Sequence, residues 1–167
     1  MLWPILDSLF RYLHILGALV WIGHNYANVV QNPTFKALHS ESSAEDREQN
    51  LTRRMQREHG IFRHASLLVL ISGLAMLWYR GTLLSALTLE GHQAMIGIGA
   101  WLGIIMVCNL WFVLWPHQKK VLGFVPASME ERIRCSRITF LSSRTNTILS
   151  FPLIFLMTAA SHSLVLF

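Results

Sequence analysis

The eight histidines are the side chains of this sequence with the greatest capacity to bind a metal or a redox cofactor. Most of them lie inside or at the ends of long uncharged segments. Ionisable groups within a membrane span are costly and usually functional, although a hydrogen bond between helices explains any single one equally well. As metal ligands and cofactor-binding residues we expect His14, His24, His64, His92 and His162.

The first uncharged segment carries two of these histidines on one face. Positions 14, 17, 21, 24 and 28 are His, Gly, Trp, His and Asn, a spacing that faces neighbouring helices rather than lipid. At a rise of 1.5 Å per residue, His14 and His24 are separated by about 15 Å along the helix axis. They therefore predict two sites, one toward each side of a membrane.

Four segments without Asp, Glu, Lys or Arg must position these side chains, namely 12–35, 64–79, 91–118 and 145–167. A spanning helix needs about 20 apolar residues, and snorkelling arginines at both ends lengthen the short second segment. We predict an all-α integral membrane protein, a four-transmembrane-helix bundle that forms a single membrane domain, 1–167. The predicted helices are 5–31, 61–84, 92–116 and 143–166.

Basic residues predict how this bundle is oriented. Twelve of the fourteen lie in or beside two long loops, 36–58 and 118–142, and two lie on the opposite side. The positive-inside rule places both loops in the cytoplasm and both termini in the periplasm, in a multi-pass protein of the bacterial inner membrane. The net charge of +5 is then a topology signal with affinity for membrane lipid, so no nucleic-acid partner is expected.

Composition excludes several classes of protein. Only 14% of the residues are charged and 53% are apolar, whereas a soluble domain carries about 25% charged residues. This argues against a disordered chain and against an ordinary soluble enzyme. Two cysteines are too few for a disulfide scaffold, and the Cys-x-x-Cys-His motif that attaches c-type haem does not occur.

The predicted orientation sorts the histidines by depth. His14, His92 and His162 fall at the outer level, and His24 and His64 fall at the inner level. Histidines at one depth on different helices suit axial ligation of haem b, with one or two haems per chain. Zinc would usually require Cys or a carboxylate in the ligand set, while copper remains possible from histidines alone.

A second polar group is predicted at the cytoplasmic level. Arg63 enters the second helix there, and Arg144 and Asn146 begin the fourth. Guanidinium groups can hold a haem propionate or an anionic substrate by paired hydrogen bonds. Snorkelling to the lipid headgroups explains both arginines equally well.

Three runs of the sequence resemble the membrane domain of bacterial urate oxidase (urate hydroxylase). They are LHILGALVWIGHNY, IGIGAWLGIIMVCNLWFVLWPHQKKVLG and SSRTNTILSFPLIFLMTAASH, and the resemblance covers most of the chain outside 36–57. The family's full-length members carry a C-terminal cytochrome c domain and are implicated in oxidising urate to 5-hydroxyisourate. The resemblance supports these family-type positions: His14, His24, Asn109, Trp111, Arg144, Asn146 and His162.

The resemblance and the histidines together leave three functions open. We expect a membrane haem b protein that carries electrons, as a stand-alone domain within a larger redox assembly or beside a separate cytochrome c. The first alternative is a urate-oxidising enzyme (a urate hydroxylase) that takes an anionic purine as substrate and feeds a separate cytochrome c. The second is a membrane subunit or assembly factor without redox chemistry, whose histidines only join helices.

Overall fold

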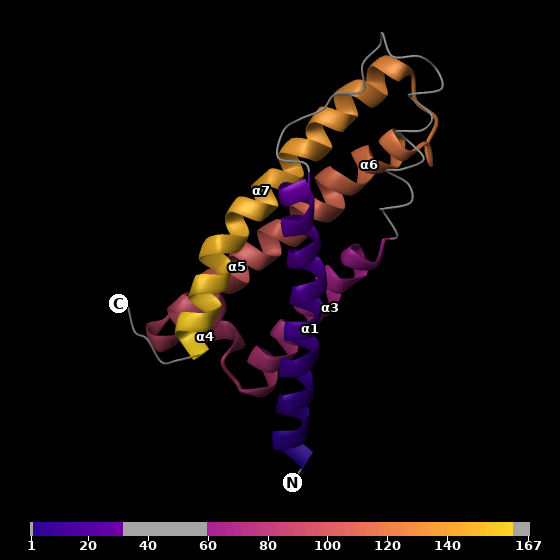
Figure 1. Cartoon of the computed structure of the whole chain (residues 1–167). Helices are drawn as coiled ribbons and strands as arrows, with labels where there is room; N and C mark the ends of the chain where they lie inside the picture. The colour runs from indigo at the N-terminus through magenta and orange to yellow at the C-terminus, as the bar shows by residue number, and fades with distance from the viewer. Residues whose placement is uncertain (1, 32–59, 162–167) are drawn as a thin grey trace.

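The structure is a computed structural model that describes residues 2–31 and 60–161, and these residues form helices joined by short turns (Figure 1). It confirms the all-α class over the described ranges, whereas the predicted loop 36–58 and His162 lie outside them. The elements in chain order are α1 (Leu2–Gln31), α3 (Ile61–Tyr79), α4 (Leu83–Leu87), the 3-10 turn η1 (Gly91–Gln93), α5 (Ala94–Cys108), the π-helix η2 (Asn109–Leu114), α6 (Trp115–Leu122) and α7 (Met129–Ser161).

Three of the described helical segments are long and apolar enough to cross a membrane. They are Trp3–Gln31, Ile61–Tyr79 and Gly91–Leu122, which makes the chain a multi-pass membrane protein in contact with lipid. The fourth predicted span, 143–166, falls on α7, whose described part ends at Ser161 and is not among the three. The count of four spans and the periplasmic position of both termini therefore stay predictions.

The second predicted helix, 61–84, ends earlier than expected, at Tyr79. Gly81 has φ 71°, a left-handed conformation that glycine adopts without a Cβ clash. Its N–H bonds the Trp78 carbonyl at 3.0 Å, and the Thr82 N–H bonds the Leu77 carbonyl at 2.9 Å. These two bonds form a Schellman motif, so α3 stops one turn before the apolar sequence does.

The predicted loop 118–142 is largely helical. α5, η2 and α6 run on without a break to Leu122, and α7 begins at Met129. Gly123, with φ 84°, closes α6, and the Phe124 N–H reaches back to the Lys119 carbonyl. Glycines therefore end both helices. Apolar composition alone suggests a later end for α3 and an earlier end for the helix that closes with α6.

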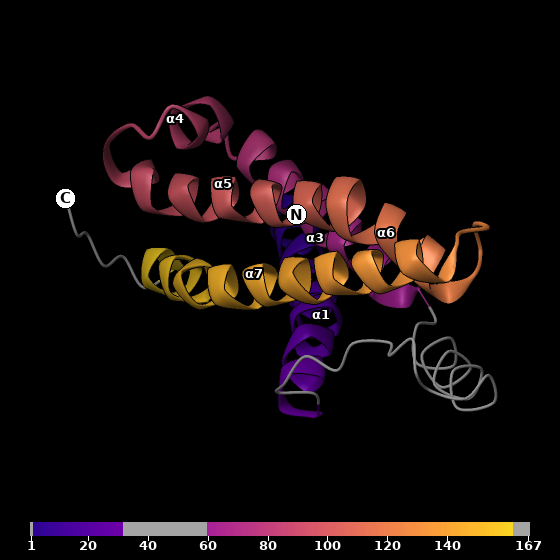
Figure 2. The same cartoon turned by 90° about the horizontal axis from the view of Figure 1, so that it is seen from above.

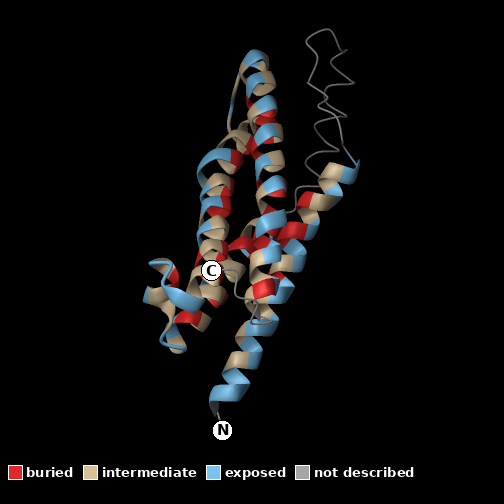
Figure 3. Ribbon diagram, turned by 90° about the vertical axis from the view of Figure 1, so that its left-hand side faces the viewer, coloured by how far each residue is buried: buried red, intermediate tan, exposed pale blue. Residues whose placement is uncertain are grey.

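The helices pack as two pairs, α1 with α3, and α7 with the continuous helix of α5, η2 and α6 (Figures 1 and 2). Figure 3 shows buried residues gathered where the pairs meet, while the N-terminal part of α1 is exposed. The core at this junction includes Trp21, Ile22, Phe62, Met106, Leu110, Leu114 and Leu153. Large apolar side chains also cover the outside, as lipid requires.

Candidate functional site

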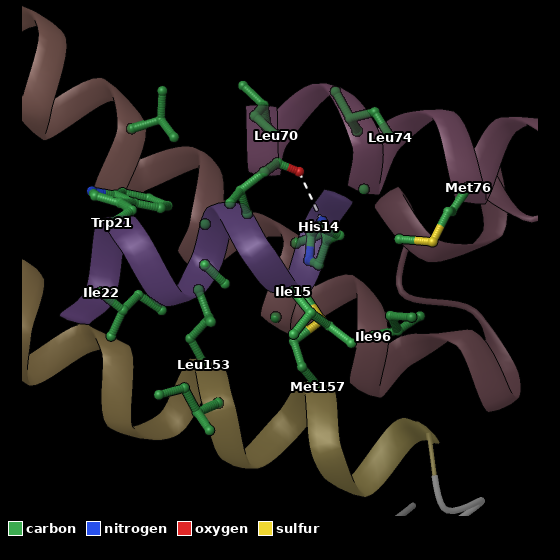
Figure 4. A pocket seen from close by; sticks show the side chains of 18 of the residues that line it. His14, Ile15, Trp21, Ile22, Leu70, Leu74, Met76, Ile96, Leu153 and Met157 are labelled. Atoms are coloured by element: carbon green, nitrogen blue, oxygen red, sulfur yellow. Dashed lines mark hydrogen bonds between the residues drawn. The ribbon is translucent and has the colours of Figure 1, made fainter. Parts of the chain in front are cut away.

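An apolar pocket lies where the two helix pairs diverge, between α1, α3, α5 and α7 (Figure 4). Its volume is about 510 Å³, within the range of about 300–1,000 Å³ that small-molecule and cofactor sites occupy. Aliphatic side chains such as Leu70, Leu74 and Ile96 form most of its described wall. Its polar side chains are His14, Trp21, Tyr26, Arg80 and Thr158.

His14 is held in one orientation by α3. Its Nδ1 lies 2.9 Å from the Val69 carbonyl oxygen and 3.2 Å from Ser72 Oγ. The Ser72 hydroxyl donates to the Leu68 carbonyl at 2.6 Å, so it acts as an acceptor toward the ring. The network therefore assigns the proton to Nδ1 and leaves the lone pair on Nε2. Metal-binding histidines usually have this arrangement, in which the second nitrogen donates to a carbonyl.

Two glycines make room for this ring. A Cβ at Gly73 of α3 would lie 2.8 Å from His14 Cε1, closer than carbon atoms approach without a shift. A Cβ at Gly17 of α1 would lie 2.9 Å from Val69 Cγ2 and 3.2 Å from the Ala65 carbonyl oxygen. Close approach of α1 to α3 is thus a condition for placing His14 in the pocket.

The opposite wall comes from α5 and α7. Gly99, Ala100 and Gly103 present little side-chain volume to the pocket, and a Cβ at Gly99 would lie 2.9 Å from Met157 Cε. Met157 and Met76 supply two thioether groups to the same lining. A thioether is a soft ligand that serves as an axial ligand in cytochromes.

The other predicted histidine ligands lie elsewhere. His24 Nε2 is 2.8 Å from Asn28 Nδ2, and its ring stacks on Phe62 with centroids 4.2 Å apart. His64 is exposed, with Nδ1 3.1 Å from the Gly60 carbonyl, and His92 is exposed in η1. Within 2–31 and 60–161, no group of three His, Cys, Asp or Glu side chains converges as a metal site.

The three side chains predicted to hold an anion have different partners. The Arg63 guanidinium lies 3.3 Å above the Trp115 ring of α6, whereas the Arg144 guanidinium lies 4.5 Å from the Phe140 ring of its own helix. Asn146 is 1% exposed and is bonded within the helix bundle, as described next. None of the three belongs to the described lining of the pocket.

Asn146 takes part in a buried polar cluster that joins α7 to the start of η2. Asn109 Nδ2 donates to Asn146 Oδ1 at 2.8 Å, and Asn146 Nδ2 donates to the Met106 carbonyl at 3.1 Å. The Ser142 hydroxyl donates to Asn109 Oδ1 at 2.9 Å. These bonds use the amide donors and acceptors of both asparagines, so the cluster explains Asn146 as a helix-to-helix contact.

Sequence reasoning missed two features of the pocket. Ser72 and the Val69 carbonyl orient His14, but neither has a sequence signal, because the partner of a ring depends on helix packing. Arg80 lines the pocket and had a signal, since it is the one basic residue between the second and third uncharged segments, 64–79 and 91–118.

Two buried donors on α1 also lack a partner among the described residues. They are Trp21 Nε1 and Asn25 Nδ2, one helical turn apart, and Trp21 is part of the pocket wall. Unpaired buried donors are uncommon in folded proteins and often mark a ligand or water position.

Comparison with known proteins gives a match to one family model. A family model described as urate oxidase N-terminal matches residues 49–167, which is more than half of the chain. This range includes α3 to α7 and begins after α1. No curated protein and no solved structure matches the chain.

Proposed function

Because this chain belongs to the urate oxidase N-terminal family, we propose that it is a membrane protein of urate oxidation that binds haem b in the pocket around His14. In this proposal it carries electrons within a larger redox assembly or toward a separate cytochrome c. The observation that carries the proposal is the orientation of His14, whose Nδ1 donates to the Val69 carbonyl.

The described residues fit such a group in three respects. Nε2 of His14 is left as the ligating nitrogen, and no described residue bonds it. Gly73 and Gly99 leave room for the His14 and Met157 side chains in the pocket wall, because an added Cβ would collide with them. The lining is almost entirely apolar, as expected around a porphyrin ring.

A haem held here would supply one-electron redox chemistry. The chain's own part is to ligate and orient it and to keep water away. The Val69 carbonyl fixes the ring of His14 and strengthens its Nε2 as a ligand. The aliphatic side chains from α1, α3, α5 and α7 supply the low-dielectric surroundings that help to set a redox potential.

The same pocket is a poor match for urate. An anionic purine presents several hydrogen-bonding groups, and burying them without partners costs free energy. Arg63, Arg144 and Asn146, which we expected to bind such an anion, are not part of the described lining. This favours electron carrying by the pocket over urate oxidation within it.

The test is the absorption spectrum of the protein purified in detergent from cells supplied with haem precursor. We expect a Soret band, with α and β bands on reduction. His14→Gly should lower haem affinity by about tenfold or more, because the ligand nitrogen is lost. Added imidazole should restore the bands, since it supplies that nitrogen in the space the side chain vacates.

Two further variants make this test specific. His24→Ala should keep the spectrum, because the His24 ring stacks on Phe62 outside the described pocket lining. His117→Ala is the control for loss of any histidine, since His117 Nδ1 bonds the Val113 carbonyl of its own helical segment. A wild-type spectrum in His14→Gly, or a wild-type protein without haem, would overturn the proposal.

A further inference from the structure

We propose that Arg80 binds a propionate of the haem, so that the carboxylate edge of the group lies at the C-terminal end of α3. This inference rests on the proposed function, since it assigns a residue to the same pocket. Arg80 is the charged residue of the described lining. A carboxylate that enters an otherwise apolar pocket requires such a partner, because an unpaired buried charge is strongly disfavoured.

The position of Arg80 along α3 suits this role. His14 lies against Gly73, and Arg80 follows seven residues later. At a rise of 1.5 Å per residue, this places the two positions about 10 Å apart along α3. That separation is comparable to the reach from the iron of a haem to the end of its propionate arms. Both residues line one continuous pocket.

The guanidinium retains donors for a second carboxylate. Arg80 Nε donates to Asp7 Oδ1 at 3.1 Å, and Nη2 donates to the same oxygen. Arginine has five N–H donors, so donors remain after these two bonds even though the Tyr79 hydroxyl also interacts with the guanidinium. Asp7 therefore holds the side chain in the pocket lining without using all of its hydrogen-bond donors.

Exposure and position both favour Arg80 over Arg63 and Arg144, the arginines that the sequence suggested. Its side chain is 36% exposed, which suits a group that pairs with a carboxylate at the edge of the bilayer. Arg63 stacks on Trp115 and Arg144 on Phe140, and neither is part of the described pocket lining. In the predicted orientation, Arg80 lies on the periplasmic side, where a separate cytochrome c would approach.

The experiment compares haem with its dimethyl ester, which lacks both carboxylates but keeps the ring and the iron. Each is added to haem-free protein in detergent, and the dissociation constants are measured by absorption. The wild type should prefer haem over the ester by about tenfold to a hundredfold, the effect of one charge-assisted hydrogen-bonded pair. In Arg80→Gln this ratio should fall close to one.

Arg11→Gln is the matched control. Arg11 donates to Asp7 Oδ2 at 3.0 Å, at the same end of α1, but it is not part of the described lining. This variant disturbs the Asp7 ion pairs while leaving Arg80, so the ratio should stay at the wild-type value. Arg63→Gln and Arg144→Gln should also keep the ratio.

The outcomes separate this inference from the proposed function. If wild-type protein binds neither compound, both fail. If it binds them but Arg80→Gln keeps the wild-type ratio, or if Arg63→Gln or Arg144→Gln abolishes it, only the role of Arg80 is overturned. Palmitate is a further probe, because a fatty acid also joins a carboxylate to an apolar body. Arg80-dependent binding of palmitate, with an unchanged haem ratio, would assign Arg80 to lipid.

Discussion

At the scale of single residues, Asn109 at the start of η2 and Asn146 of α7 show how polar side chains are accommodated in a membrane bundle. Asn109 and Asn146 donate and accept within one cluster, and Asn146 is almost fully buried. The Met106 carbonyl, which the Asn146 amide bonds, lies three residues before the π-helix. Bonds from a neighbouring helix thus stabilise the place where the regular α-helical pattern changes.

Asn146→Ala should destabilise the protein by about 1–3 kcal/mol, because Asn109 and the Met106 carbonyl lose their partner in a buried site. The measurement is unfolding in mixed detergent micelles. Combining it with Asn109→Ala should cost less than the sum of the single changes, by about 0.6 kcal/mol or more, the usual coupling in a membrane bundle. Thr145→Ala, an exposed neighbour bonded within its own helix, is the control. Additive costs would contradict the cluster.

At the scale of helices, glycine positions decide how closely α1 and α3 approach. Gly73→Ala should destabilise by about 1–3 kcal/mol, because the new Cβ forces the His14 ring or the helix to move. Gly23→Ala is the matched control for stability, since a Cβ there meets nothing within 4 Å. It should stabilise by up to about 1 kcal/mol through helix propensity. Equal stability changes in both variants, measured by thermal unfolding, would contradict the close contact at Gly73.

The contact between α6 and α7 predicts a dependence on pH. The hydrogen bond from Lys120 lowers the pKa of Glu131 below its ordinary value of 4.5. A depressed carboxyl pKa stabilises the fold above the unfolded pKa, and this contribution is lost as the pH falls through the folded pKa. Glu131→Gln should therefore lower the melting temperature slightly at pH 7 and equal the wild type at strongly acidic pH.

Glu130→Gln, at the exposed neighbouring position, is the control for removing one negative charge from the first turn of α7. High salt should reduce the effect of Glu131→Gln, because this ion pair is partly open to solvent. A difference from the wild type that persists at low pH would rule out the ion pair as its cause.

At the scale of the whole molecule, the two helix pairs meet around Trp21 and diverge to leave the pocket between them (Figures 1 and 4). One pair is tied to the other by the Tyr26 hydroxyl, which lies 2.9 Å from Ser150 Oγ. Since the Ser150 hydroxyl donates to the Thr147 carbonyl, Tyr26 is the donor in this bond. The pocket is therefore a property of how the pairs are joined, and no single helix contains it.

Orientation in the membrane is the prediction that belongs to this scale. Because twelve of fourteen basic residues lie on one side, we expect both termini in the periplasm. A phosphatase fused after Phe167 should be active, and a fluorescent protein that folds only in the cytoplasm should be dark when fused there. The reverse result would place Arg80 on the cytoplasmic side and remove its exposure to a periplasmic partner.

The sequence alone determined the helical class and the membrane setting, and it singled out His14, which the structure places in the pocket lining. Long uncharged apolar segments favour lipid over water as their surroundings. A 3-4-3-4 spacing brings His14 to the face of its helix that meets other helices. Both conclusions depend only on local chemistry. The resemblance of three runs to the urate oxidase membrane domain also indicated the family, and the family match over 49–167 confirms it. The ends of α3 and α6 differ from the predicted ends, because Gly81 and Gly123 stop these helices through backbone conformation rather than hydropathy.

Only the tertiary structure decided which predicted residues share a site. Depth along the membrane grouped His14 with His92, but His92 is exposed in η1 and is not part of the described pocket lining. Arg63, Arg144 and Asn146 are close in predicted depth, yet they face Trp115, Phe140 and Asn109. Arg80, which caps the C-terminal end of α3, is part of the pocket lining. Depth follows from residue order, whereas the direction a side chain faces depends on how whole helices pack.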